Sequence, residues 1–315
     1  MRAPRTRRRL RRHDLRAALT AAGLSLLVAA TADAADPQKL AGIGDSISQG
    51  FSANNWPGDH PSYAFGQGTD AGVNSLYLRY KAKFPALTKE FVTVSGAEMV
   101  GGSNSAAAQA ARICAQGSRP NRVVIELGGN DVCNRDSGTA ADAASGLYSV
   151  TTYRNGLKAA LDLLGGCLPS GSQVLVLSMP RVDYLYEAGN AKNAFLCNTV
   201  WSLAGVCSVV TSESNATRRR QIGARVDAYN DGLRTEVAAA ESRYTGKVHF
   251  ITDWQGPLTS SPNTSVGAYK FSAADINTVD CFHPHKDTGQ KKLACDAWEA
   301  SEYGNLANIG STCLR

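Results

Sequence analysis

The sequence of 315 residues is long enough for one large domain or two small ones, and its 43% hydrophobic and 19% charged content supports a substantial core and excludes a disordered chain. The formal net charge of +6 is unevenly distributed, because residues 1–34 contain eight of the 33 basic residues and only two of the 27 acidic ones. The remainder balances 25 basic against 25 acidic residues, and this neutrality disfavours binding to nucleic acid.

Residues 1–34 have the features of a secretory signal peptide. Arginines crowd the stretch up to Arg16, an apolar segment follows over residues 17–30, and residues 32–34 (Ala-Asp-Ala) offer small side chains for cleavage. The apolar segment is shorter than the roughly 20 residues that a membrane-spanning helix needs. We therefore predict an exported protein, secreted or periplasmic, with a mature part over residues 35–315. An uncleaved anchor is the alternative.

The mature part alternates short apolar segments with longer Ala-rich ones. The short segments are typical of buried strands, and the long ones are typical of helices, the last with apolar residues at spacings of three and four. This alternation predicts one α/β domain, a three-layer α/β/α sandwich around a mostly parallel sheet. The predicted strands are Leu40–Gly44, Phe91–Ser95, Arg122–Leu127, Gln173–Ser178 and Lys247–Thr252, and the predicted helices are Ser105–Cys114, Ala140–Leu164 and Arg219–Arg243.

All eight cysteines lie in the mature part, and none forms the Cys-x-x-Cys pair of a zinc ribbon or a redox motif. An even number of cysteines in an exported chain predicts disulfide bonds. Among the many pairings that are formally open, we expect only that near neighbours such as Cys197 and Cys207 are joined.

The first predicted strand ends in Gly44-Asp45-Ser46. This places a serine hydroxyl at the sheet edge where α/β proteins bind ligands, and glycine permits a tight departure from the strand. A serine is a weak nucleophile unless a base takes its proton. Most such tripeptides are ordinary turns, so a catalytic role for Ser46 depends on a histidine partner.

His283 is the best candidate for this base among the four histidines of the mature part. It follows Asp280 by three residues, and this spacing lets the carboxylate bind one ring nitrogen while the other faces the serine. We expect His60 to be solvated in a Pro- and Asp-rich loop and His249 to be packed or paired within a strand. A surface turn with an incidental contact is the alternative for Asp280 and His283.

Two further loops at the same edge offer hydrogen-bond donors for a developing oxyanion. Residues 128–131 (Gly-Gly-Asn-Asp) follow the third predicted strand, and the Asn130 amide could supply one donor. The backbone N–H groups of Gly96, after the second strand, and of Ser46 could supply two more. Each loop alone is common turn chemistry, and their combination indicates acyl transfer.

The four blocks, in this order, resemble the SGNH (GDSL) hydrolase superfamily. Its pattern is Gly-Asp-Ser near the N-terminus, an isolated Gly, Gly-x-Asn-Asp, and Asp-x-x-His near the C-terminus. The resemblance spans nearly the whole mature part and implies the three-layer fold of that family. The matching residues are Gly44–Ser46, Gly96, Gly128–Asp131 and Asp280–His283.

By this resemblance, Ser46 is the nucleophile, His283 the base and Asp280 its orienting acid, while Ser46, Gly96 and Asn130 form the oxyanion hole. Gly101 and Gly102 lie close by in the sequence and are alternatives to Gly96. Such a serine hydrolase needs no cofactor. The absence of a Gly-x-Ser-x-Gly segment argues against the nucleophile elbow of the α/β-hydrolase fold.

A closer resemblance is to acyloxyacyl hydrolases and secreted phospholipase B-type enzymes, which remove fatty acyl chains from lipids. We expect this protein to lack the saposin-like portion of acyloxyacyl hydrolase. The resemblance implies a lipid ester as substrate and transient contact with a lipid surface. It rests on Ile43–Ser46, Gly129–Cys133, Leu168–Ser172 and Asp280–Pro284.

Other functions are compatible with parts of the sequence. A carbohydrate acetylesterase of the same fold is the second hypothesis, and a non-catalytic binding protein is the least consistent with four complete blocks. A metal-dependent hydrolase would use the carboxylates and imidazoles of residues 280–287, namely Asp280, His283, His285 and Asp287. Either an acyl groove or the protein core would account for the apolar residues after the nucleophile block, which are Trp56, Tyr63, Phe65, Tyr77 and Leu78.

Overall fold

Five parallel strands form the central sheet of the computed structural model, which describes residues 35–256 and 270–313. The sheet has the order β2-β1-β3-β4-β5. The predicted signal peptide, residues 1–34, lies outside the described residues and stays a prediction. The strands are β1 (Lys39–Gly44), β2 (Thr88–Phe91), β3 (Arg122–Glu126), β4 (Ser172–Val176) and β5 (Val248–Thr252).

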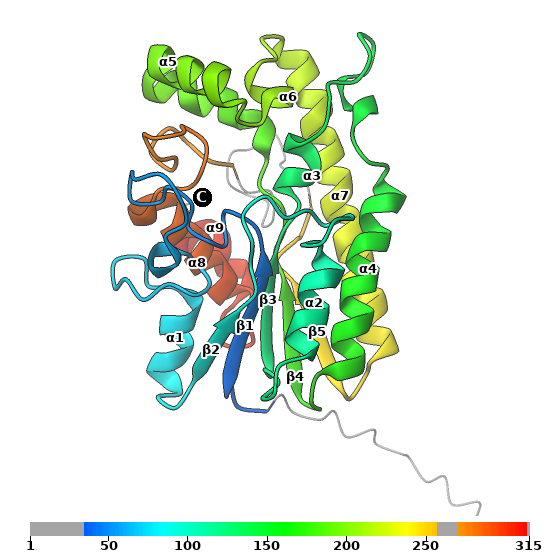
Figure 1. Ribbon diagram of the computed structural model, residues 1–315. Helices are drawn as coiled ribbons and strands as arrows, with labels where there is room; N and C mark the ends of the chain where they lie inside the picture. Colours follow the sequence, from blue (N-terminus) through cyan, green and yellow to red (C-terminus); the bar gives the residue numbers. More distant parts are fainter. Residues whose placement is uncertain (1–34, 257–269, 314–315) are drawn as a thin grey trace, which may run out of the picture. The chain divides into compact units, whose positions relative to one another are not determined.

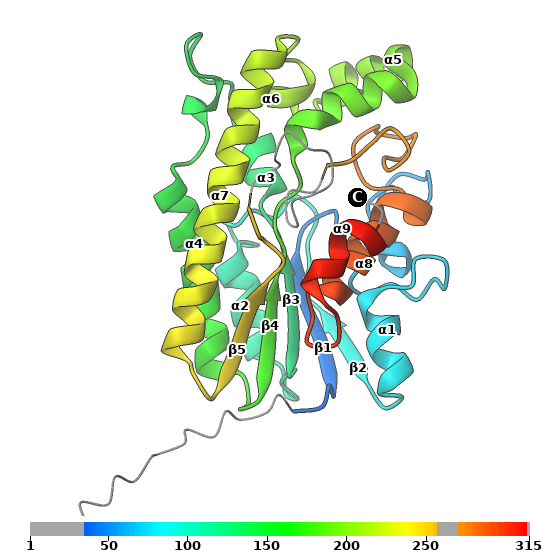
Figure 2. The same cartoon turned by 180° about the vertical axis from the view of Figure 1, so that it is seen from behind.

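Helices cover both faces of this sheet, so the predicted three-layer α/β/α sandwich is confirmed. In Figures 1 and 2, α2, α4 and α7 lie on one face, α1, α8 and α9 lie on the other, and α5 lies beyond the carboxyl ends of the strands. No helix in the described part of the chain is both long and apolar enough to cross a membrane. The helices are α1 (Leu76–Lys83), α2 (Ala106–Cys114), α3 (Gly129–Cys133), α4 (Val150–Cys167), α5 (Leu185–Ala204), α6 (Ser208–Thr211), α7 (Ala216–Arg243), α8 (Lys291–Glu299) and α9 (Ile309–Thr312).

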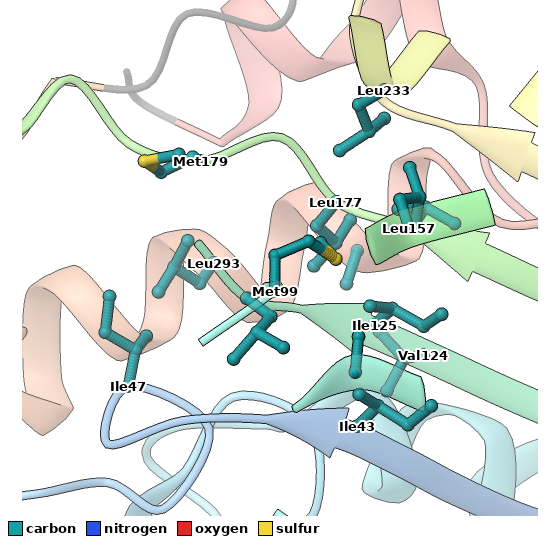
Figure 3. Packing of buried hydrophobic residues seen from close by; sticks show 14 of the residues in the cluster. Ile43, Ile47, Met99, Val124, Ile125, Leu157, Leu177, Met179, Leu233 and Leu293 are labelled. Atoms are coloured by element: carbon teal, nitrogen blue, oxygen red, sulfur yellow. The ribbon is translucent and has the colours of Figure 1, made fainter. Parts of the chain in front are cut away.

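The core fills the space between the sheet and its two helical layers. Figure 3 shows Ile43 and Ile125 of the sheet with Leu157 of α4 and Leu293 of α8, which approach from the two layers. The predicted apolar face of the last helix is confirmed, because its five residues are all buried: Ile222, Val226, Tyr229, Leu233 and Val237. Burial of this face stabilises α7 far more than its intrinsic propensity does.

Two elements occupy other residues than the sequence predicted. The second strand occupies Thr88–Phe91 instead of residues 91–95, because an edge strand is half exposed and carries Lys89 and Glu90 where a buried strand would be apolar. The fourth helix begins at Val150 instead of residue 140. A separate short turn, Ala143–Gly146, precedes it, and the Ser149 hydroxyl then caps the helix by accepting a hydrogen bond from Thr152 N.

Four disulfide bonds pair all eight cysteines, so the prediction of disulfides is confirmed. The expected pair Cys197–Cys207 is wrong. Cys197 lies inside helix α5, which continues to Ala204, and Cys207 lies beyond this helix, directly before α6. Cys197 pairs with Cys281, and Cys207 pairs with Cys133 of α3. Four disulfide bonds in one domain are typical of proteins in an oxidising, extracellular compartment. The bonds are Cys114–Cys167, Cys133–Cys207, Cys197–Cys281 and Cys295–Cys313.

Candidate active site

The strand order places a crevice at the carboxyl ends of β1 and β3. The chain leaves β1 for β2 on one side and returns to β3 on the other, so the loops after β1 and β3 diverge at this point. Ligands of open α/β sheets bind at such a switch point. Ser46 follows β1 and Asn130 follows β3, and both line a cavity at this edge of the sheet.

The turn that carries Ser46 is fixed by close packing around Gly44. A Cβ atom at this position would lie 2.1 Å from Ser48 Oγ and 2.8 Å from the carbonyl oxygen of Glu126, so only glycine fits. Gln109 of α2 binds both backbone groups of Gly44, accepting from its N–H at 2.9 Å and donating to its carbonyl at 3.0 Å. These contacts hold the end of β1, and hence Ser46, in one position.

The structure brings Ser46, His283 and Asp280 into a chain of hydrogen bonds. Ser46 Oγ lies 2.8 Å from His283 Nε2, and His283 Nδ1 lies 2.9 Å from Asp280 Oδ2. If the proton of a neutral imidazole is on Nδ1, the carboxylate accepts it, and Nε2 accepts from the serine hydroxyl. The Phe51 ring packs against the imidazole at a centroid distance of 4.9 Å. Residues 237 positions apart thus meet in a geometry suited to proton transfer.

Asp280 is buried, and its surroundings favour the ionised form. Burial alone would raise the pKa of Asp280, but His283 and hydrogen bonds from neighbouring N–H groups outweigh it and lower the pKa to about 2. Its Oδ1 accepts from the side chain of Asn277 at 2.8 Å and from the backbone N–H groups of Phe282 and His283 at 2.9 Å each. The carboxylate therefore has a fixed orientation toward the ring.

The environment of His283 has two opposing effects. Burial of the ring lowers its pKa, but the charge of Asp280 and its hydrogen bond, with smaller contributions from Asp45 and Asp59, raise the pKa above the ordinary value of 6.5. The imidazole is thus a stronger base than a free histidine. This is the property that proton abstraction from a serine requires.

The loop that carries both residues is closed at its base and tied to α5. Ile276 and Pro284 form an antiparallel bridge, and Asn277 N donates to the carbonyl of His283 at 2.9 Å. Between Asp280 and His283, Cys281 adopts a left-handed conformation with φ of 54°, which is uncommon for a side chain with a Cβ atom. The Cys197–Cys281 disulfide fixes this strained residue to α5.

Three candidate donors for an oxyanion surround the serine. In the described part of the chain, neither Ser46 N nor Gly96 N donates a hydrogen bond to another protein group. The Asn130 amide donates to the carbonyl of Ala97 at 2.9 Å and to Asp45 Oδ2 at 3.3 Å. Asn130 thus contacts Ala97, the residue next to Gly96. This contact favours Gly96 over Gly101 and Gly102 as the glycine of the oxyanion hole. Gly96 has φ of 83°, which glycine adopts without strain.

Acidic side chains are buried beneath these loops. Burial raises the pKa of Asp45 to about 6 and that of Asp131 to about 7. Burial and the nearby charge of Asp45 raise the pKa of Glu126 well above its ordinary value. Asp131 accepts hydrogen bonds from Met99 N at 2.6 Å and Val100 N at 3.0 Å, and so anchors the loop that follows Gly96.

A small, mainly apolar cavity adjoins Ser46. Its enclosed volume is about 20 Å³, which is roughly the room that one water molecule needs. Ser46, Asn130 and Asp45 contribute its polar part. The apolar side chains come from the segments after β1 and β4, from the start of α5 and from residues 271–282: Ile47, Pro180, Val182, Leu185, Phe271 and Phe282.

The residues proposed above for an acyl groove do not line this cavity. Phe65 is buried in the core, and Tyr77 packs against Lys89. Phe65 is therefore a core residue, which was the alternative to an acyl groove. Trp56 is largely exposed to solvent and belongs neither to the core nor to this cavity. The sequence analysis did not identify the cavity-lining residues that follow β4, such as Pro180. The ligand-edge rule that identified Ser46 applies equally to the segment Ser178–Pro180, which follows β4.

The other polar candidates lie apart from this chain of hydrogen bonds. His60 Nε2 lies 3.0 Å from the carbonyl of Trp56, and His249 pairs with Glu241 at 3.3 Å, as expected for a paired strand residue. His285 contacts Asn55 at 3.2 Å. Within the ranges described, no group of three or more His, Cys, Asp or Glu side chains is placed to hold a metal ion.

Sequence reasoning also missed the supports of Asp280. Asn277 binds the carboxylate, and Trp201 of α5 donates its indole N–H to the backbone carbonyl of Asp280 at 3.0 Å. Asn277 precedes Asp280 by three residues, and an asparagine at that spacing is a turn signal that could have indicated it. Nothing in the sequence pattern indicates Trp201, because it is 79 positions away.

The sequence of the chain is similar to a known protein family. The sequence matches the model of the GDSL-like Lipase/Acylhydrolase family over residues 40–295. No curated relative matches it.

Several solved structures are similar at low identity. An extracellular lipase from Streptomyces rimosus is 20% identical, with 84% of this chain and 100% of that chain covered and a TM-score of 0.48. The esterase EstA from Pseudoalteromonas sp. is 13% identical, with coverages of 84% and 96% and a TM-score of 0.39. A variant of an acetyl-xylooligosaccharide esterase from Geobacillus stearmophilus is 16% identical, with coverages of 85% and 96% and a TM-score of 0.44. At these identities, none of them assigns an activity to this chain.

Proposed function

Because the chain belongs to the GDSL-like Lipase/Acylhydrolase family, we propose that it is an exported carboxylic-ester hydrolase that removes acyl groups from lipid esters. The proposed nucleophile is Ser46, with His283 as general base and Asp280 as the acid that orients it. The contact of 2.8 Å between Ser46 Oγ and His283 Nε2 is the observation that carries this proposal.

The proposed reaction has two steps that share one base. His283 takes the proton of Ser46 as Oγ attacks the ester carbonyl, and it then protonates the departing alcohol, which leaves an acyl-enzyme. Water, deprotonated by the same imidazole, attacks the acyl group. The bond to Ser46 Oγ then breaks, His283 returns its proton to that oxygen, and the carboxylic acid is released. Burial of Asp280 and its three N–H donors support its role as a fixed counter-charge for the imidazolium.

We assign the oxyanion hole to the backbone N–H groups of Ser46 and Gly96 and to the Asn130 side chain. The two backbone groups have no protein acceptor in the described part of the chain, so they are available to an oxyanion. Of the two contacts that the Asn130 amide makes, the longer, to Asp45 at 3.3 Å, is the one that an oxyanion would replace.

A second candidate is an acetylesterase that acts on carbohydrate esters. The enclosed cavity of about 20 Å³ beside Ser46 favours it, because a short acyl group fits such a space more readily than a long chain. The apolar lining of that cavity favours a lipid ester instead. A panel of acetyl, octanoyl and palmitoyl esters separates the two functions, and turnover confined to acetyl esters would rule out the lipid substrate.

The nucleophile assignment is tested with Ser46→Ala, and Ser52→Ala is the matched control. Ser52 lies in the same loop and is buried, and its hydroxyl has no hydrogen-bond partner among the described residues, so its loss removes no hydrogen bond. We expect Ser46→Ala to reduce ester turnover by at least about a thousandfold and to abolish labelling by a fluorophosphonate. Ser52→Ala should retain both. Normal turnover by folded Ser46→Ala would contradict the proposal.

A further inference from the structure

Helix α5 exposes apolar side chains on its outer side. Of the large hydrophobic residues that the described part leaves exposed, three of five lie on this helix, with Phe195 85% and Leu203 83% accessible and Leu196 less so. No charged residue occurs between positions 193 and 212. An exposed apolar cluster within an uncharged stretch is typical of an interaction surface.

Phe195 and Leu203 stand at the two ends of a shallow groove on this surface. They are eight residues apart, which is roughly 12 Å along a helix. The groove has a volume of about 590 Å³. Its other lining side chains are small or uncharged: Ala194, Asn198, Thr199 and Ser202. The surface therefore offers neither an ion pair nor a cluster of charges to a partner.

The inner side of the same helix is attached to the candidate active site. Cys197 forms a disulfide with Cys281, which lies between Asp280 and His283, and Trp201 donates to the carbonyl of Asp280. Leu185, at the start of α5, lines the cavity beside Ser46. The apolar outer surface and the loop that carries the proposed base therefore lie on opposite sides of the same helix.

Another exposed apolar residue, Trp56, lies on the opposite side of that loop from α5. Trp56 is 70% accessible. Its neighbour Asn55 accepts hydrogen bonds from Thr278 N and Oγ1 at 2.9 Å each and contacts His285 at 3.2 Å. In both views, the orange segment after residue 270 lies between α5 and the loop that follows β1 (Figures 1 and 2). Exposed apolar groups therefore flank the candidate site on two sides.

We propose that the outer face of α5, formed by Phe195, Leu196 and Leu203, docks onto the surface of an uncharged or zwitterionic lipid aggregate and presents the Ser46 cavity to esters in it. This inference rests on the proposed esterase function and adds the physical form of its substrate. Apolar side chains that enter a lipid interface contribute binding through their buried area. Anionic membranes instead attract clusters of lysine and arginine, which residues 193–212 lack.

The binding test uses the Ser46→Ala protein, which should leave the lipid intact, and vesicles of phosphatidylcholine. The test variant is Phe195→Ser with Leu203→Ser. The control is Leu163→Ser, which removes an exposed apolar side chain from the last turns of α4. We expect co-flotation with vesicles to fall roughly tenfold or more in the double variant and to stay unchanged in the control. Equal flotation of all three proteins, or none by the parent, would overturn the proposal.

A second measurement uses proteins with Ser46 intact and compares hydrolysis of a tributyrin emulsion with hydrolysis of dissolved p-nitrophenyl acetate. The ratio of the two rates should fall about tenfold in the double variant and not in Leu163→Ser. Failure of the esterase function would appear as soluble-ester turnover that survives Ser46→Ala, whereas failure of the docking surface would leave the ratio constant. A dimer of the parent that dissociates in the double variant would identify a second copy as the partner and overturn lipid docking.

Discussion

At the scale of single residues, the contact between Asp280 and His283 moves two pKa values apart. The pKa of Asp280 falls to about 2, since His283 and the N–H donors outweigh the effect of burial, and the pKa of His283 rises above 6.5 because Asp280 outweighs burial of the ring. As the proposed base, His283 acts only when neutral. Ester turnover should therefore decline as the pH falls through the raised pKa of His283, with its acid limb above pH 6.5.

Asp280→Asn tests this assignment through the pH profile. Loss of the carboxylate removes the main cause that raises the pKa of His283, so the acid limb of kcat/KM should move to lower pH. The amide also no longer holds the Nδ1 proton, and we expect kcat to drop by roughly 10³- to 10⁴-fold. Asp287→Asn, an exposed acid four residues beyond His283, is the control and should leave both unchanged. An acid limb that stays in place in Asp280→Asn would contradict the assignment of the base.

The residues of the candidate site were predictable because each belongs to a short local motif. Ser46, Asn130 and the pair Asp280 and His283 stand directly after strands or within one turn, and the parallel sheet gathers such positions at one edge. Phe271 and Leu185 of the cavity were not predictable in this way. Their contribution depends on how distant segments pack, which no local pattern records.

At the scale of secondary structure elements, the disulfide between α5 and the His283 loop should matter more for activity than for stability. Its loop of 84 residues and the 53-residue loop closed by Cys114–Cys167 have similar lengths, and chain entropy gives each about 4 kcal/mol. Of the four cysteines in these two bonds, only Cys281 belongs to the turn between Asp280 and His283, and its backbone is in a left-handed conformation.

We expect Cys197→Ser with Cys281→Ser to lower kcat for a soluble ester by roughly tenfold or more, because the strained turn relaxes and misplaces the imidazole. Cys114→Ser with Cys167→Ser, which separates α2 from α4, is the matched control. Thermal unfolding should show a similar loss of stability in both double variants. Equal kcat values in the two would contradict a positioning role for the Cys197–Cys281 bond.

Elements were predictable where one face or the whole segment is buried. Strand β3 is buried throughout and has the apolar centre Val123–Ile125, whereas β2 lies at the edge of the sheet and carries two charged residues, Lys89 and Glu90. Helix α5 went unpredicted because apolar residues occur on its inner side, at Trp201, and on its outer side, at Phe195 and Leu203. No amphipathic period results from such a distribution.

At the scale of the whole molecule, the disulfide pairing was beyond sequence reasoning. The bonds join cysteines up to 84 positions apart, and proximity in sequence favoured the wrong pair. The three-layer architecture was predictable because the strand and helix periods alternate along the entire mature chain. Which cysteines meet depends on how these layers pack, and the order of residues along the chain does not indicate that packing.

Buried acids give the molecule an unusual dependence of stability on pH. Burial raises the pKa values of Asp45 and Asp227 to about 6 and that of Asp131 to about 7. Between their unfolded values near 4 and these raised values, the folded state binds more protons than the unfolded state, so the free energy of unfolding increases as the pH falls. Protonation of Asp280 opposes this only below about pH 4, because its folded pKa is about 2.

We therefore expect maximal stability on the acidic side of neutrality, with a gain of up to a few kcal/mol between about pH 7 and pH 4.5. Asp131→Asn removes one of the groups responsible, so its free energy of unfolding in urea should rise less steeply over this interval than that of the parent. Asp136→Asn, an exposed acid on the following loop, is the control and should keep the parental slope. The variant also loses an acceptor for Met99 N or Val100 N, which lowers stability at every pH but does not reproduce a change in slope. Parallel pH curves for the parent and Asp131→Asn would show that this carboxyl ionises in the folded protein as it does in the unfolded chain.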